Sequence, residues 1–474
     1  RDEWKFGGLV VSDYESITEM VRHGYARDAR DAAREALSAS VDMEMVSTSY
    51  FDHLKSLVES GEISLPMIDA AVRRILELKF RLGLFDQRAQ STTPAQPAQE
   101  SREVARRLAT ESAVLLKNDG NVLPISGTNT KVAVIGPLAD SPVDQMGTWV
   151  MDARTEDVET PLTSLRRALG NSHVIYAKAM ANSRDIRHDG FAEALAAARQ
   201  ADVVLLFLGE EQILSGEAHS RAFLDLPGAQ EALVEEIAKA GKPMVGILQA
   251  GRPMTFHNAA ARLNAVLYAW HPGTVGGPAI ADLRLGRANP SGKLPMTFPR
   301  TVGQVPIYYN HLNTGRPAST GELGIPLGNP VNPTGYTSKY VDVDFTPEYP
   351  FGYGLSYTRF EYSGMRLSTN RLRMGATLEV SAEVRNSGSR EGDEVVQLYV
   401  RDLVGSVARP VRELKGFRRV HLKAGEKQTV HFSLSTADLA FYNDRMQLVA
   451  EPGDFQVWIA PDSASGVEGA FRVE

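Results

Sequence analysis

The segment GLVVSDY, residues 8–14, decides how the first part of the chain is interpreted. Its short apolar run is typical of a strand buried in a parallel sheet, and the run leads directly to the carboxylate of Asp13. Because α/β folds build their sites at the carboxyl ends of strands, Asp13 is a candidate catalytic residue. Position alone leaves an alternative, in which Asp13 only caps the following helix. The spacing of Ser16 and Glu19 predicts a capping box, which would supply that cap instead.

The residues around this segment predict two strand–helix units, which together occupy residues 1–85. A helical pattern continues to about Leu37, and a second short strand follows at Val41–Met45. Residues 66–82 predict an amphipathic helix with a proline at its start and a glycine after its end. The chain starts at Arg1 and reaches its first strand almost at once, so we expect an upstream piece to be missing or to be a separate chain.

Two acidic residues, Asp42 and Glu44, lie within the second predicted strand. They could line a site, or they could belong to the framework of a barrel-like sheet. We favour the structural interpretation for both.

A second α/β block is predicted over residues 101–310, after a polar, proline-containing linker at residues 86–100. It opens with a helix at about 101–113, and further helical stretches at 191–200 and 228–241 separate continuous apolar strands. This alternation predicts a mainly parallel sheet that is covered by helices on both faces. The predicted strands are Val132–Ile135, Val174–Ala177, Val203–Leu208, Met244–Leu248 and Ala265–Tyr268.

The last part of the chain has a different pattern. Residues 311–350 are rich in Gly, Pro, Asn and Thr, and an extended connection is predicted over residues 311–357. Short alternating strands separated by turn signals then occupy residues 358–474, which predicts a β-sandwich of immunoglobulin or fibronectin type. The predicted strands include Thr377–Val384, Glu394–Val400, Thr429–Leu434 and Phe455–Ile459.

A second candidate carboxylate, Glu217, lies in the polar loop that follows the strand Val203–Leu208. Loops after the strands of an open parallel sheet are preferred ligand sites. The neighbouring His219 and Arg221 could position or tune a carboxyl group in this loop. Judged on these residues alone, a solvated charged loop without catalytic role is the favoured alternative.

The same loop begins with two rival carboxylates, Glu210 and Glu211. The bare sequence does not choose among the three glutamates.

Composition and motifs exclude several classes of function. The chain has 474 residues, a net charge of −7 and no cysteine, which excludes disulfides, thiol nucleophiles and thiolate metal sites. No basic stripe suggests nucleic acid, and no apolar run is long enough to cross a membrane. We find neither a GxGxxG nor a Walker A motif, and the histidines form no metal-binding pattern. The sequence therefore predicts no cofactor, metal, nucleic acid or membrane partner.

In combination, these features resemble glycoside hydrolase family 3, and the resemblance extends over essentially the whole chain. Residues 8–14 are similar to the family's nucleophile segment. Residues 306–317 are most similar to bacterial, periplasmic-type β-glucosidases, and residues 349–357 resemble the opening of the family's fibronectin type III-like domain. Further similar stretches are residues 39–45, 73–85, 113–118, 269–273 and 289–295.

The resemblance implies a multidomain α/β fold in three parts. Residues 1–85 would be the last two units of a (β/α)₈ TIM barrel that lacks its first six, because a full barrel takes about 250 residues. Residues 101–310 would be an α/β sandwich, and residues 358–474 a fibronectin type III-like β-sandwich. The linker 86–100 and the connection 311–357 would join these parts.

The resemblance also assigns the two candidate carboxylates. The family's nucleophile falls on Asp13, and its general acid/base falls on Glu217 rather than on Glu210 or Glu211. Such an enzyme is a retaining, exo-acting β-glycosidase that works through a covalent glycosyl-enzyme.

Three further residues are predicted to contact the sugar. Tyr14 stands where many relatives have Trp and would form part of the wall of the sugar pocket. His219 and Arg221 are the other predicted substrate contacts. Most of the family's glucose-binding residues belong to the part of the barrel that we expect to be missing.

The resemblance implies terminal β-glucosides or oligosaccharides as substrates, in the periplasm or outside the cell. A β-xylosidase is the nearest alternative because one hydroxymethyl group separates the two sugars; activity on N-acetylglucosaminides is less favoured. A different kind of alternative is an incomplete or non-catalytic fragment that needs a barrel chain as its partner. A homodimer is a further predicted assembly.

Overall fold

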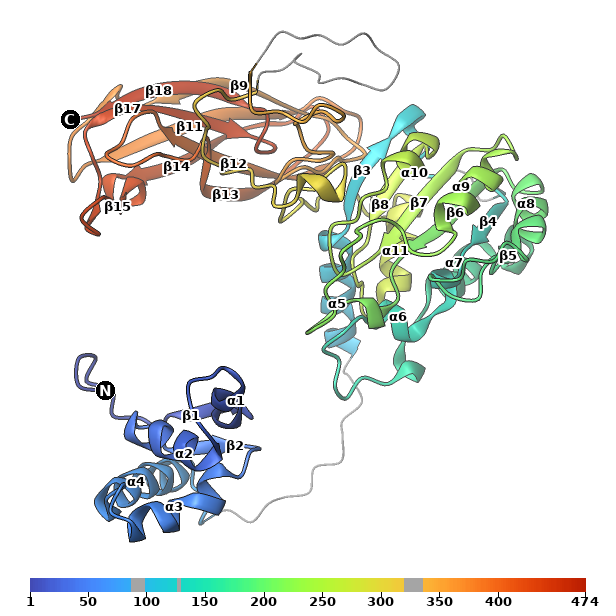
Figure 1. Ribbon diagram of the computed structural model, residues 1–474. Helices are drawn as coiled ribbons and strands as arrows, with labels where there is room; N and C mark the ends of the chain where they lie inside the picture. Colours follow the sequence, from blue (N-terminus) through green and yellow to red (C-terminus); the bar gives the residue numbers. More distant parts are fainter. Residues whose placement is uncertain (87–98, 126–128, 319–335) are drawn as a thin grey trace. The chain divides into compact units, whose positions relative to one another are not determined.

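The computed structural model of the chain describes residues 1–86, 99–125, 129–318 and 336–474, and it contains two compact units, Arg1–Gln96 and Pro97–Glu474 (Figure 1). Residues 87–98 of the predicted linker and residues 319–335 of the predicted connection lie outside the described residues. Among the described residues, no helix has both the length and the apolar character needed to cross a lipid bilayer.

The first unit alternates strands and helices as the sequence predicts. Its strands β1 and β2 pair in parallel, with Val11 opposite Met43 and Tyr14 opposite Met45. In chain order, the elements are β1 (Val11–Tyr14), α1 (Ser16–Arg22), α2 (Ala29–Ser38), β2 (Met43–Met45), α3 (Ser49–Glu59) and α4 (Leu65–Arg81).

The helix predicted to run from Ser16 to about Leu37 is wrong as a single helix, since α1 and α2 are separated by a turn. Gly24 lies in this turn with φ of 73°, a conformation that costs glycine little and interrupts the helical path. The side chain of Asp28 then starts α2 by accepting a hydrogen bond from the Asp31 amide. The predicted helix 66–82 is confirmed as α4, which carries Pro66 in its first turn.

Small side chains let the helices of the first unit pack closely. Ala32, Ala33 and Ala36 of α2 are buried, and Leu37 of the same helix joins Leu57 of α3 in one apolar cluster. The unit also exposes many large apolar side chains, including those of its short sheet.

The second unit begins with a six-stranded sheet of order β3-β8-β7-β6-β4-β5. The predicted strands are confirmed, and the sheet is parallel except at β3, which runs antiparallel to β8 along one edge and was not predicted. The bounds are β3 (Val114–Asn118), β4 (Val132–Ile135), β5 (Val174–Ala177), β6 (Val203–Gly209), β7 (Met244–Gln249) and β8 (Ala265–Tyr268).

Helices cover both faces of this sheet, as the continuous burial of its strands requires. One apolar core joins the sheet to α8 (Phe191–Arg199), α9 (Gln230–Ala238) and α10 (His257–Arg262). A second core joins the opposite face to α7 (Pro161–Leu169) and α11 (Gly276–Leu285), and α5 (Gln99–Ser112) packs against α11. The short helix α6 spans Pro142–Met146, and 3₁₀ turns span Asp119–Asn121, Pro137–Asp140, Thr155–Asp157, Asn171–His173, Gln212–Leu214, Val302–Gln304 and Thr436–Leu439.

The carboxyl-terminal part of the second unit is a β-sandwich. Its two main sheets have the orders β10-β18-β17-β12-β13 and β14-β11-β9 and enclose one apolar core. The strands are β9 (Phe360–Leu367), β10 (Arg371–Leu372), β11 (Thr377–Asn386), β12 (Gly392–Asp402), β13 (Glu413–Leu422), β14 (Lys427–Ser435), β15 (Phe441–Tyr442), β16 (Leu448–Val449), β17 (Gly453–Ala460) and β18 (Val467–Val473).

A buried ion pair joins the α/β part to the sandwich. Lys293 lies 3.2 Å from Glu394 and also donates to the Gly354 carbonyl, while Tyr362 donates to Glu394 at 2.7 Å. The α/β part and the β-sandwich are thus held together by specific polar contacts.

Candidate active site

Asp13 lies in β1, one residue before its end, and is exposed. One carboxylate oxygen, Oδ1, accepts the Tyr14 amide at 2.7 Å, and its main-chain carbonyl accepts the hydroxyls of Ser12 and Ser16. The second carboxylate oxygen, Oδ2, accepts no hydrogen bond among the described residues. The side chain is therefore oriented from its own strand while one oxygen stays open to a ligand.

The capping box predicted from Ser16 and Glu19 is wrong. The N-cap residue of α1 is Glu15, with φ of 51°, and no side chain caps this helix end. The Ser16 hydroxyl donates instead to the carbonyl of Asp13 at 3.2 Å. Since Asp13 does not cap the helix either, its alternative role as a helix cap has no support in the structure.

Asp42, just before β2, and Glu44, within β2, both make structural contacts. Asp42 is buried and binds Arg1, Arg74 at 2.6 Å and the Val10 amide at 3.0 Å. Burial favours the neutral acid, but hydrogen bonds from Arg74 and Val10 outweigh it and lower the pKa of Asp42. Glu44 accepts the first two amides of α3, at 2.9 and 2.7 Å. These contacts agree with the structural interpretation of both residues.

The second candidate region starts where β6 ends. Gly209 has φ of 125°, and a Cβ at this position would lie 1.9 Å from the carbonyl oxygen of Gln249 on β7. Only glycine fits this close approach, and the next residue, Glu210, continues the pairing through its amide and the Gln249 carbonyl at 2.8 Å. The loop that carries the candidate carboxylates is thus anchored on two central strands.

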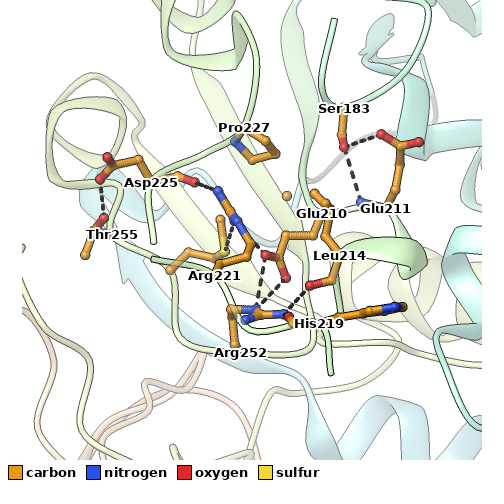
Figure 2. Close-up of polar contacts among 12 residues, drawn as sticks. Ser183, Glu210, Glu211, Leu214, His219, Arg221, Asp225, Pro227, Arg252 and Thr255 are labelled. Carbon is orange, nitrogen blue, oxygen red and sulfur yellow. Dashed lines mark hydrogen bonds and ion pairs between the residues drawn. The ribbon is translucent and has the colours of Figure 1, made fainter. Parts of the chain in front are cut away.

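Glu210 is completely buried and pairs with two arginines, as Figure 2 shows. Arg221 lies 2.6 Å from Oε1 of Glu210, and Arg252 approaches both carboxylate oxygens at 3.2 Å. Both arginine side chains are themselves mostly buried, with 16% and 19% of their surface exposed. A glutamate enclosed in this way is occupied by the protein and is not available to a substrate.

Glu211 points away from this cluster, toward Ser183 (Figure 2). It accepts the Ser183 hydroxyl at 2.8 Å and pairs with Arg184 at 3.0 Å. Burial acts to raise its pKa, but the hydrogen bonds from Arg184 and Ser183 outweigh that effect and lower it. The second rival carboxylate is therefore also committed to a structural contact.

Glu217, by contrast, is exposed at the tip of a tight turn. The residues on either side, Gly216 and Ala218, both have positive φ, at 115° and 60°. A left-handed alanine is uncommon, and such strained positions gather at functional sites. Among the described residues, the Glu217 carboxylate makes no hydrogen bond or ion pair. It is the one of the three glutamates in this loop with a carboxylate free to react.

The structure gives the remaining predicted site residues specific surroundings. Tyr14 is 61% exposed, beside Asp13. His219 is exposed, and its Nδ1 lies 3.1 Å from the Ser215 carbonyl. Arg221 positions a carboxylate, as predicted, but that carboxylate is Glu210 and not Glu217. The contacts of all three residues with a sugar stay predictions.

Arg252, which completes the cluster around Glu210, was not predicted from the sequence. The signal was present, because Arg252 follows the predicted strand Met244–Leu248 as Glu210 follows Val203–Leu208. Adjacent parallel strands end at the same edge of a sheet, so an arginine and a glutamate at these positions can meet once the sheet order places β6 beside β7.

No group of three or more His, Cys, Asp or Glu side chains arranged to hold a metal ion occurs within residues 1–86, 99–125, 129–318 and 336–474.

Comparison with known families decides the identity of this framework. The model of the glycosyl hydrolase family 3 C-terminal domain matches residues 113–357, more than half of the chain. The chain belongs to glycosyl hydrolase family 3. The family's N terminal domain matches residues 1–78, and a fibronectin type III-like domain matches residues 394–463.

Individual members of the family are similar along the whole chain. The periplasmic beta-glucosidase of Salmonella typhimurium is 41% identical over all of this chain, and a beta-xylosidase of Formosa agariphila is 37% identical over 98% of it. The crystal structure of a beta-glucosidase from Listeria innocua in complex with glucose superposes with a TM-score of 0.90 at 39% identity, again over the whole chain. The chain spans 64% of the length of each of these three proteins.

Proposed function

We propose that this chain supplies both catalytic carboxylates of a retaining, exo-acting β-glucosidase, with Asp13 as nucleophile and Glu217 as general acid/base. The observation that carries the proposal is that an exposed carboxylate is presented in each of two segments that match separate domains of the family. The rival carboxylates Asp42, Glu210 and Glu211 are all engaged by arginines.

In this mechanism, the open Oδ2 of Asp13 attacks the anomeric carbon while the bond to the leaving oxygen breaks. Glu217 gives its proton to that oxygen, and a covalent glycosyl-enzyme forms. Glu217 then takes a proton from water, the water oxygen attacks the anomeric carbon, and the Asp13 carboxylate leaves. Two inversions give net retention, the outcome of glycosidases whose two catalytic carboxyl groups lie about 5–5.5 Å apart. Water is the only co-reactant.

The first unit is proposed to be part of a (β/α)₈ barrel that further strands complete. Its two-stranded sheet exposes Val11, Met43 and Met45 at 44%, 45% and 38%, and large exposed side chains such as Phe51 at 89% surround it. Apolar surface and open strand edges of this kind are stabilised when other strands and helices cover them. The partner that fits is the segment that corresponds to the part of the relatives not matched by this chain.

The proposed substrate is a terminal β-glucoside, after the activity named for the Salmonella and Listeria proteins. A β-xyloside is the second candidate, because the two Formosa agariphila relatives are named beta-xylosidase and putative beta-xylosidase. Tyr14, beside the nucleophile, and His219 and Arg221, near the acid/base, are the proposed sugar contacts. The proposed compartment is the periplasm or the cell exterior, after the name of the Salmonella relative.

The deciding experiment measures hydrolysis of 4-nitrophenyl β-glucoside and β-xyloside. The chain is assayed alone and together with the unmatched amino-terminal segment of the Salmonella relative. We expect activity with the segment, a faster rate on the glucoside, and a loss of about 10⁴-fold in Asp13→Asn. Asp69→Asn, which removes the same charge from an exposed position on α4, is the control and keeps full activity.

Each contrary result has a defined meaning. A faster rate on the xyloside would replace the glucoside as substrate. Activity that survives Asp13→Asn would remove this residue from the mechanism. Failure of every combination, with both components folded, would favour the interpretation of the chain as a non-catalytic partner.

A further inference from the structure

We propose that Glu210 is a positioning residue for the acid/base, acting through Arg252 and Arg221 to hold the turn that carries Glu217. This inference rests on the proposed role of Glu217. The buried carboxylate of Glu210 would thus fix the position of the exposed carboxylate of Glu217. Residues 214–221, which carry Glu217, are called the acid/base turn.

Arg252 forms hydrogen bonds with the acid/base turn on both sides of Glu217. Its guanidinium donates to the carbonyl of Leu214, before Glu217, and to that of His219, after it, the latter at 2.9 Å. The same guanidinium pairs with Glu210 through Nε (Figure 2). One planar group therefore joins the buried carboxylate to both arms of the turn, in a geometry that lysine cannot reproduce.

Arg221 closes the far end of the same turn. Its Nη1 lies 2.6 Å from Glu210, and its Nη2 donates to the Asp225 carbonyl at 2.9 Å. The segment from Glu210 to Arg221, which contains Glu217, is therefore closed into a loop by the ion pair between its two end residues.

Burial makes Glu210 necessary to this arrangement. The carboxylate has no exposure to solvent, and the two arginine side chains beside it are mostly buried, so solvent screens their charges weakly. Without the carboxylate, two cations would repel each other at the base of the turn. Removing one partner of a buried ion pair leaves an uncompensated buried charge, so the loss of Glu210 would disturb the base of the turn.

The acid/base turn also contacts the residues at the ends of neighbouring strands. The carbonyl of Arg252 accepts the hydroxyl of Tyr268 on β8, and burial, together with the charge of Glu210, raises the pKa of Tyr268 so that this hydroxyl stays protonated. Gly251 lies directly beneath the turn, since a Cβ there would come within 2.0 Å of the Ser215 hydroxyl oxygen. Glu210, Arg221 and Arg252, together called the clamp, are thus anchored at the ends of β6, β7 and β8.

General acid catalysis requires this precision. The proton donor must lie within hydrogen-bond distance of the leaving oxygen, and a displacement of about 1 Å can cost about 10²-fold in rate. The Glu217 side chain has no hydrogen bond of its own among the described residues, so the main chain of its turn must set its place.

The test compares Arg252→Gln, Arg252→Lys and Glu210→Gln with a matched control, Arg300→Gln. Arg300 is 26% exposed, pairs with Glu348 at 3.1 Å and donates to the Thr346 carbonyl at 3.0 Å, away from the acid/base turn. It therefore reports the cost of losing a half-buried arginine in general. Arg252→Gln and Arg252→Lys keep the experiment informative if Glu210→Gln does not fold.

Two measurements are made on each variant. Amide hydrogen exchange of peptides covering the acid/base turn reports the clamp without any need for activity. The kcat/KM for a series of aryl β-glucosides graded in leaving-group acidity, measured in the complemented enzyme, reports acid assistance. Glu217→Gln is the reference for its complete loss.

We expect faster exchange of the turn in the three test variants but not in Arg300→Gln. We also expect kcat/KM in Arg252→Gln to fall about 10²-fold for the poorest leaving group and to change little for the most acidic one, with partial recovery in Arg252→Lys. Unchanged exchange, or an equal loss for all leaving groups, would overturn the inference. If Glu217→Gln itself shows no dependence on the leaving group, the proposed function fails, whereas the exchange data still decide whether the clamp exists.

Discussion

The end of β1 and the loop after β6 each present one exposed carboxylate, and the two regions hold it by different means. Around Asp13, the contacts come from the same strand and the turn behind it, within three residues along the chain. Around Glu217, the contacts come from Glu210 and from Arg252, which binds the carbonyl of His219 from 33 residues away in the sequence. One region is organised locally, and the other depends on the folded sheet.

Exposure alone therefore does not describe a candidate catalytic residue. A nucleophile at a strand end inherits its direction from the strand, because strand geometry fixes where successive side chains point. A carboxylate on a loop tip has no such direction and needs contacts from outside the loop. Changes in the two regions should therefore produce different signatures, and the following experiments test that.

The largest contrast is expected between the two carboxylates themselves. Glu217→Gln should lower kcat/KM by about 10²–10⁴-fold for poor leaving groups while sparing the most acidic ones, because only the former need a proton. Added azide should restore turnover in this variant, since azide attacks the glycosyl-enzyme without base assistance and yields a glycosyl azide. In Asp13→Asn, neither a more acidic leaving group nor added azide should restore turnover.

Glu211→Gln is the matched control for that experiment, because it alters a glutamate of the same loop that pairs with Arg184. It should keep the kinetics of the parent chain with every leaving group. If azide rescues Glu211→Gln instead of Glu217→Gln, the two assignments must be exchanged.

A smaller contrast is expected in stability, between Glu210 and Glu211. Glu210→Gln leaves two buried arginines without their carboxylate and should lower the free energy of unfolding by about 3–5 kcal/mol. Glu211→Gln should cost about 1 kcal/mol or less, because its partner Arg184 is 52% exposed and solvent screens the pair. Thermal unfolding of the two variants measures the difference, and equal losses would show that Glu210 does not occupy a special position.

The sequence was most informative where one physical rule acts alone. The buried strand β4 matches the predicted Val132–Ile135 because a continuous apolar run between polar turns leaves few alternatives. The break at Gly24 was missed, since a single glycine is tolerated in many helices and only the packing of α1 and α2 shows that the chain turns there.

The same reasoning explains what could be predicted of the site. Asp13 was found from its place at a strand end, which is a local property. Glu217 was separated from Glu210 and Glu211 only by resemblance to a family, because the three differ in burial and pairing rather than in sequence context. The pairing of Glu210 with Arg252 joins two loops of neighbouring strands, so it depends on sheet order, which a single sequence does not specify.

The smallest expected effect concerns the framework of the first unit, where Asp42 takes the place that Glu210 has in the second. Its pKa is lowered in the folded chain, because hydrogen bonds from Arg74 and the Val10 amide outweigh the effect of burial. A lowered pKa stabilises the fold above the unfolded value of about 3.9, and this stabilisation is lost as pH falls through the folded value. The unfolding free energy should therefore decline below about pH 4, by at most about 1.4 kcal/mol per pH unit from this group.

Asp42→Asn should remove that part of the acid dependence, whereas Asp69→Asn, at an exposed site on α4, should retain it. Urea unfolding between about pH 2.5 and pH 6, followed by circular dichroism, measures both slopes. If Asp42→Asn keeps the parent's acid dependence, the ion pairs with Arg1 and Arg74 do not stabilise the first unit. In that case, the end of β1 that carries Asp13 would be held in place by its own strand alone.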